Sequence, residues 1–182
     1  RAGGARRHSV RLIYFVAIGL GYILVEIAFI QRFVLFLGHP TYALTVVVFL
    51  LLLSSGLGSL FSRKCIGPTA SAWLPLLLII AALLLYVWIL PGVLNALVGL
   101  PFAAKLAMSG LLLVPLGFAM GMPFPTGLRS LAGLPLPNAA AGATANNAVE
   151  WAWAMNAAST VLGSVLAMVI AIQFGLNVTL IC

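Results

Sequence analysis

The sequence predicts an all-α protein, a polytopic transmembrane helical bundle. The 182-residue chain is 64% hydrophobic and only 6% charged, with a mean hydropathy of +1.23, whereas about a quarter of the residues in a soluble domain are charged. Apolar windows of about 20 residues, long enough to cross roughly 30 Å of hydrocarbon, recur along the chain. Because two acidic residues cannot provide a soluble surface, we expect the outer surface to face lipid.

About five full spans and the start of a sixth are expected, within a single transmembrane domain that covers residues 1–182. Its first eleven residues form a short basic segment, and a sixth apolar window begins near Asn177. The chain starts with Arg and stops within an apolar segment, so we expect a fragment of a longer protein. The five full windows lie at residues 12–37, 41–61, 72–91, 101–122 and 148–173.

The positions of Lys and Arg predict the orientation. These residues gather in segments 1–11, 62–71 and 123–147, whereas the turn at residues 38–40 carries none. Cytoplasmic loops are enriched in Lys and Arg, so the N-terminus is expected in the cytoplasm. The net charge of +7 needs no nucleic-acid partner, because the cations flank apolar windows and form no continuous face.

Residues 123–147 are rich in Pro, Gly, Ala and Asn and show no helical stripe, which predicts a loop. We expect Asn147 to cap the following helix, with Glu150 reaching back as in a capping box. This structural role is favoured for Glu150 over catalysis or transport.

Small residues at helical spacing predict where helices pack closely, since lipid provides little hydrophobic gain for helix association. The first window carries Ala17 and Gly21 in such positions. A phosphate-binding role for the glycines would need a strand before them, which this sequence does not predict. The proposed packing residues of the other windows are Ser54, Gly58, Gly117, Gly121, Ser159, Gly163, Ala167 and Ala171.

Glu26 lies in the first window at a depth of roughly 16 Å, close to the midplane, where a charge costs on the order of 3 kcal/mol. We expect it to face the bundle interior and to be protonated or held by polar groups. A structural hydrogen bond and a role in cation binding or proton movement both stay open. The candidate polar site consists of Glu26, Gln31, Arg32, Asn156, Ser159 and Thr160.

Two cysteines and two histidines, far apart along the chain, form no pattern typical of a metal site or a disulfide framework. No set of residues suggests a nucleophile with its base, or a pair of catalytic carboxylates. We therefore expect no metal or cofactor in this chain and no catalytic site within it.

Four stretches resemble a known family: "GYILVEIAFIQRFVLFLGHPTYAL", "SSGLGSLFSRK", "GFAMGMPFPTGLR" and "WAWAMNAASTVLGSVLAM". They are similar to the membrane region that follows the soluble domain in bacterial spermidine synthase-like proteins, whose membrane part is described as major-facilitator-like. The resemblance implies a multi-pass protein of the bacterial cytoplasmic membrane, joined to a Rossmann-like domain on the cytoplasmic side. Any aminopropyltransferase-like activity would belong to that domain.

Two functions are therefore expected from the sequence. The first is a membrane domain that anchors the soluble domain and handles a small cationic molecule. The alternative is an accessory or structural subunit of a larger membrane complex, with other transmembrane helices as partners.

Overall fold

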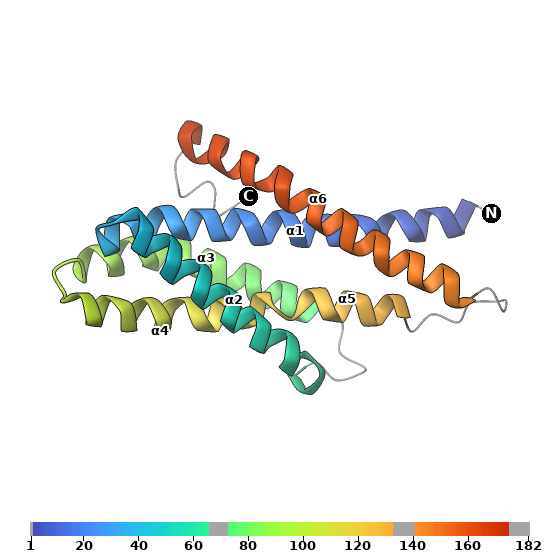
Figure 1. The fold of residues 1–182 in the computed structure, drawn as a ribbon, viewed down its shortest axis with the longest axis horizontal. Helices are drawn as coiled ribbons and strands as arrows, with labels where there is room; N and C mark the ends of the chain where they lie inside the picture. The colour runs from blue at the N-terminus through green and yellow to red at the C-terminus, as the bar shows by residue number, and fades with distance from the viewer. Residues whose placement is uncertain (1, 66–72, 133–140, 175–182) are drawn as a thin grey trace.

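The structure is a computed structural model that describes residues 2–65, 73–132 and 141–174. The described chain is helical apart from short turns (Figure 1), which confirms the all-α prediction. The helices are α1 (Ala2–Leu37), α2 (Pro40–Cys65), α3 (Trp73–Ala96), α4 (Phe102–Met120), α5 (Pro123–Ala132) and α6 (Ala141–Phe174).

The helices contain five segments that are long and apolar enough to cross a membrane. The basic segment before the first span belongs to the same helix as that span, because α1 begins at Ala2. The predicted sixth window near Asn177 lies outside the described residues. The five candidate spans are Leu12–Leu37, Pro40–Ser62, Leu76–Ala96, Phe102–Arg129 and Val149–Phe174.

The loop predicted at residues 123–147 is wrong at both ends. Its first ten residues form α5. Proline is tolerated in the first turn of a helix, because the N–H groups there have no partner within the helix and proline lacks that group. Its last seven residues belong to α6, which begins in an alanine-rich stretch that favours helix. Asn147 therefore lies inside α6 and does not cap it, so the predicted capping box is also wrong.

The helices pack as a bundle with α1 at its centre (Figure 1). Its most extensive neighbours are α6, which runs in the same direction and crosses it obliquely, and α2, which runs in the opposite direction. A second parallel pair consists of α2 and α4, and α3 packs on α4. We call the end with the α1–α2 and α3–α4 connections the turn end. The α1–α2 turn there needs a glycine, since Gly38 has a φ of 81°.

The buried core lies between α1, α2, α3 and α4, toward the turn end. Three phenylalanines of α1 fill its centre, and the rings of Phe33 and Phe36 meet edge to face at 5.9 Å. Tyr86 of α3 packs on Phe29 and donates a hydrogen bond to the Leu112 carbonyl at 2.5 Å. These contacts join α3 to both α1 and α4.

Close contact between α2 and α4 depends on small residues. A Cβ atom added at Gly58 would fall against the Phe118 carbonyl group, and one at Gly121 would fall against that of Ser55. Gly117 lies against the Ser54 hydroxyl in the same way. Gly58 and Gly121 therefore let the two helices approach to backbone distance, and Gly117 makes room for the Ser54 side chain.

The predicted ridge on α6 packs against α1. Ser159 is 3% exposed and Ala167 is fully buried, and a Cβ at Gly163 would collide with the side chain of Ile23. Ala171 is only partly buried, because α6 diverges from α1 toward its end (Figure 1). Three of the four ridge residues thus lie in the contact between α6 and α1.

The small residue that α1 contributes to this contact differs from the prediction. Ala17 is exposed, and a Cβ at Gly21 would meet no described atom within 4 Å. Gly19 makes the close approach instead, since a Cβ there would lie 2.6 Å from the Asn156 carbonyl oxygen. The sequence identified a face of small residues but placed it on the wrong side of α1.

Candidate intramembrane site

Glu26 is partly buried in the middle of the α1 span. It follows Tyr22 by one helical turn, and the Tyr22 hydroxyl lies 3.2 Å from the Ser55 hydroxyl of α2. It also follows Ile23, which packs on α6, by three residues. Successive residues turn by about 100° around a helix. The Glu26 side chain therefore leaves α1 between its contacts with α2 and with α6.

No hydrogen bond or ion pair to the Glu26 carboxylate is formed by the described residues. The Tyr22 hydroxyl, one helical turn away, is close enough to feel the charge of this carboxylate. The sequence pointed to Asn156, Ser159 and Thr160 as its partners. The structure does not bring them to it.

The three polar residues of α6 form a separate group. Ser159 and Thr160 donate hydrogen bonds to the Asn156 carbonyl at 2.8 and 2.9 Å, and the group packs on Gly19. Gly19 precedes Glu26 by seven residues, or about 10 Å along α1. The Ser159 and Thr160 hydroxyls therefore lie about 10 Å along α1 from the Glu26 carboxylate.

Asn156 is the member of this group whose side chain is least satisfied. Its Oδ1 atom is buried and has no hydrogen-bond partner among the described residues. A buried amide oxygen without a partner is uncommon in proteins, so Asn156 marks a second polar point on the α1–α6 contact.

Gln31 and Arg32 lie nearer the turn end. The Gln31 amide is 3.6 Å from the Met168 sulfur, a weak contact, and its Oε1 atom is buried without a hydrogen-bond partner in the described chain. Arg32 lines a cavity between α1 and α3. The six residues predicted as one polar site thus lie at three places, with Glu26 between the other two.

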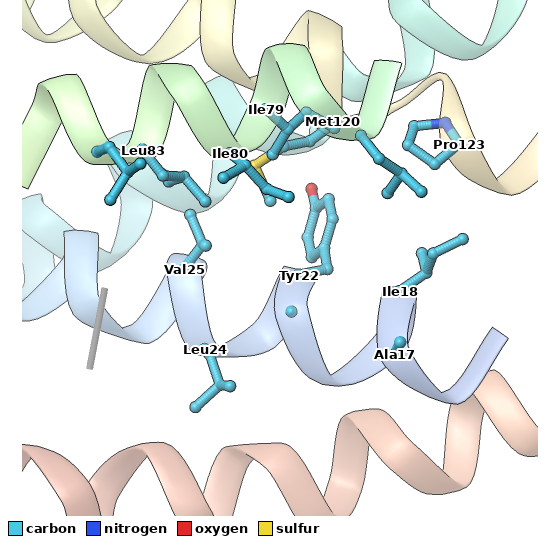
Figure 2. A pocket seen from close by; sticks show the side chains of 13 residues that line it. Ala17, Ile18, Tyr22, Leu24, Val25, Ile79, Ile80, Leu83, Met120 and Pro123 are labelled. Atoms are coloured by element: carbon cyan, nitrogen blue, oxygen red, sulfur yellow. The ribbon is translucent and has the colours of Figure 1, made fainter. Parts of the chain in front are cut away.

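A groove of about 230 Å³ lies between α1 and α3 on another side of α1. Figure 2 shows the Tyr22 ring pointing into it toward Ile80 and Met120. Its lining is apolar apart from the Tyr22 hydroxyl. Glu26 is not among the residues that line this groove, although Tyr22, one helical turn before it, is.

Sequence reasoning missed Tyr22 as a polar neighbour of Glu26 and Ser55 as the hydrogen-bond partner of Tyr22. Tyr22 could have been found, because it precedes Glu26 by one turn. Ser55 could not, because its position beside α1 depends on the register between α1 and α2. Arg129 was also missed: it donates hydrogen bonds to Ser62 at 2.9 Å and to Thr126 at 3.0 Å, which fixes α5 to the end of α2.

In the described part of the chain, no group of three or more His, Cys, Asp and Glu residues could hold a metal ion. A scan against family models and searches of curated proteins and of solved structures found no match to this chain. The resemblance to spermidine synthase-like membrane proteins therefore stays a prediction.

Proposed function

We propose that this chain is the integral membrane domain of a spermidine synthase-like protein of the bacterial cytoplasmic membrane. In this proposal the N-terminus faces the cytoplasm, where the bundle anchors a Rossmann-like domain. Glu26 provides an intramembrane site for a small cation of the polyamine class. Support comes from the bundle of apolar helices and from the surroundings of one carboxylate.

The surroundings of Glu26 carry the proposal. A charged carboxylate near the centre of a bilayer costs on the order of 3 kcal/mol, and no described residue offsets this cost with a hydrogen bond. A bound ammonium group would supply both a charge and N–H donors, and charge-assisted hydrogen bonds are stronger than neutral ones. The Tyr22 ring, one turn away, would add a favourable aromatic surface for a cation.

Changing Glu26 to Gln is expected to weaken spermidine binding at least tenfold, because a charge-assisted hydrogen bond contributes roughly 1.5–3 kcal/mol. Binding of labelled spermidine to the full chain in nanodiscs measures this. Glu150→Gln is the matched control, since Glu150 is exposed near the start of the α6 span and its loss should leave binding unchanged. Equal binding by the Glu26→Gln variant and the parent would refute the site.

The structure also changes the expectation for Glu26→Leu. Polar groups that held Glu26 would be left unpaired by a leucine, but the carboxylate has no described hydrogen-bond partner to lose. We expect this variant to keep the parent's thermal midpoint in detergent while losing spermidine binding. A clear fall in the midpoint would instead identify Glu26 as a structural residue.

The accessory-subunit function is favoured by a different observation, the large apolar side chains exposed on α3 and α6. Trp88 is 89% exposed and Ile172 is 74% exposed, and such surfaces suit other helices as well as lipid. The coding sequence upstream of Arg1 separates the two proposals. A Rossmann-like domain there supports the first, whereas a start codon next to Arg1 supports the second.

A further inference from the structure

A second cavity, of about 210 Å³, opens between α1 and α3 at the turn end of the bundle. Arg32 and Asn95 provide its polar groups, and Phe36, Pro91 and Leu94 contribute apolar surface. Arg32 lies five residues before the end of α1, or about 7.5 Å along the helix. Asn95 is the next-to-last residue of α3. The cavity is therefore at the depth where lipid head groups meet hydrocarbon.

The charge around this cavity is positive. The Lys105 ammonium group lies 5.5 Å from the centre of the Phe36 ring, and Phe36 also lines the cavity with Arg32. A cation–π contact of this kind holds an ammonium group in place. Of the chain's two acidic residues, Glu26 lies six residues from Arg32, or about 9 Å along α1. Glu150 belongs to the opposite end of the bundle, where α6 begins.

The wall of the cavity carries exposed apolar side chains. Leu35 lines it and is 75% exposed, and Val98 lines it and is 51% exposed. Below it, Phe29 and Tyr86 close the space between α1 and α3, so the cavity does not continue into the groove of Figure 2. An occupant would thus meet Arg32 at its polar end, with Lys105 held on the ring of the lining residue Phe36, and apolar side chains along its side.

We infer that this cavity binds the head group of an anionic phospholipid. The phosphate lies against Arg32, within reach of the Lys105 charge, while Asn95 contacts the glycerol part and an acyl chain runs along Leu35. Lys and Arg side chains beside a membrane attract anionic lipid head groups, and each nearby cation contributes on the order of a fivefold gain in affinity. Charge and an adjoining apolar surface together favour a phospholipid over a soluble anion. The inference does not depend on cation binding at Glu26.

The test is a titration of the full chain in detergent with short-chain phosphatidylglycerol, followed by native mass spectrometry. Lys105→Gln is expected to weaken binding about fivefold, and Arg32→Gln by the same factor or more. Lys64→Gln is the matched control, because Lys64 lies 5.7 Å from the Phe61 ring near the other end of the bundle. If Arg32→Gln does not fold, Lys105→Gln and its control decide the matter alone.

Two further ligands identify what the cavity recognises. Phosphatidylcholine, which has no net charge, and glycerol phosphate, which has no acyl chain, should each bind at least fivefold more weakly than phosphatidylglycerol. Equal binding of phosphatidylcholine would show that charge is not recognised, and equal binding of glycerol phosphate would identify a soluble-anion site. Either result overturns the inference, as does an equal effect of Lys105→Gln and Lys64→Gln.

Discussion

Replacing Gly58 with leucine is expected to lower the stability of the bundle by about 3 kcal/mol or more, the upper range for overpacking. A Cβ at this position would lie 2.8 Å from the carbonyl carbon of Phe118 and 3.1 Å from its Cα atom. Both atoms belong to the backbone of α4, which cannot turn away as a side chain can. The whole of α4 would have to move from α2, which would open a contact that also holds Gly117 and Gly121.

Gly56→Leu is the matched control, because it lies on the same helix and a Cβ there meets no described atom within 4 Å. Thermal unfolding in detergent, followed by the loss of monodisperse protein, should show a large fall for Gly58→Leu and little change for Gly56→Leu. Similar midpoints for the two variants would mean that α2 and α4 do not pack as described.

Gly163→Leu should cost about 2 kcal/mol, less than Gly58→Leu, because part of the obstruction can move. The nearest atom to a Cβ at Gly163 belongs to the side chain of Ile23, which has other rotamers. The Cα atom of Leu20, 3.4 Å away, limits how far a leucine can be accommodated. We therefore expect α6 to separate from α1 and the protein to become less stable.

Ala158→Leu is the control for this variant, since Ala158 is an exposed small residue of the same helix. It should keep the parent's thermal midpoint, whereas Gly163→Leu should lower it. If both variants extract and unfold as the parent does, the ridge of α6 faces lipid and the α1–α6 contact is wrong.

The spans could be predicted because the property that defines them is local. A run of about twenty apolar residues predicts a helix that can cross the bilayer, whatever packs beside it. The faces of small residues on α2, α4 and α6 could also be predicted, since the spacing along one helix determines which residues share a face. Gly19 was missed because the contact face of α1 depends on where α6 crosses it, and no spacing within α1 records that.

The prolines of α5 show a limit of a different kind. Pro123 and Pro125 favoured a loop in the sequence, yet both lie in the first turn of a helix, where proline is tolerated. The break between α4 and α5 is held by Tyr14, which donates a hydrogen bond to the Pro123 carbonyl at 2.9 Å. Tyr14 and Pro123 are 109 residues apart in the sequence, so no local sequence pattern predicts their contact.

Glu26 could be singled out from the sequence, whereas the arrangement of the polar residues around it could not. Glu26 stood out because a carboxylate in an apolar window is costly, and this reasoning needs no structure. Its supposed partners on α6 were chosen by depth alone. The register of two parallel helices, set by the fit of Gly19 against Asn156 and Ser159, places those partners about 10 Å along α1 from the carboxylate.

The most direct test of the central claim is whether Glu26 reacts with an apolar carbodiimide in the membrane. Such reagents modify carboxylic acids that are reached from the hydrocarbon and not engaged by protein groups. Peptide mass spectrometry of the full chain in nanodiscs should show the adduct at Glu26, and saturating spermidine should strongly reduce it. An unmodified Glu26, or modification that spermidine does not change, would contradict the proposed cation site.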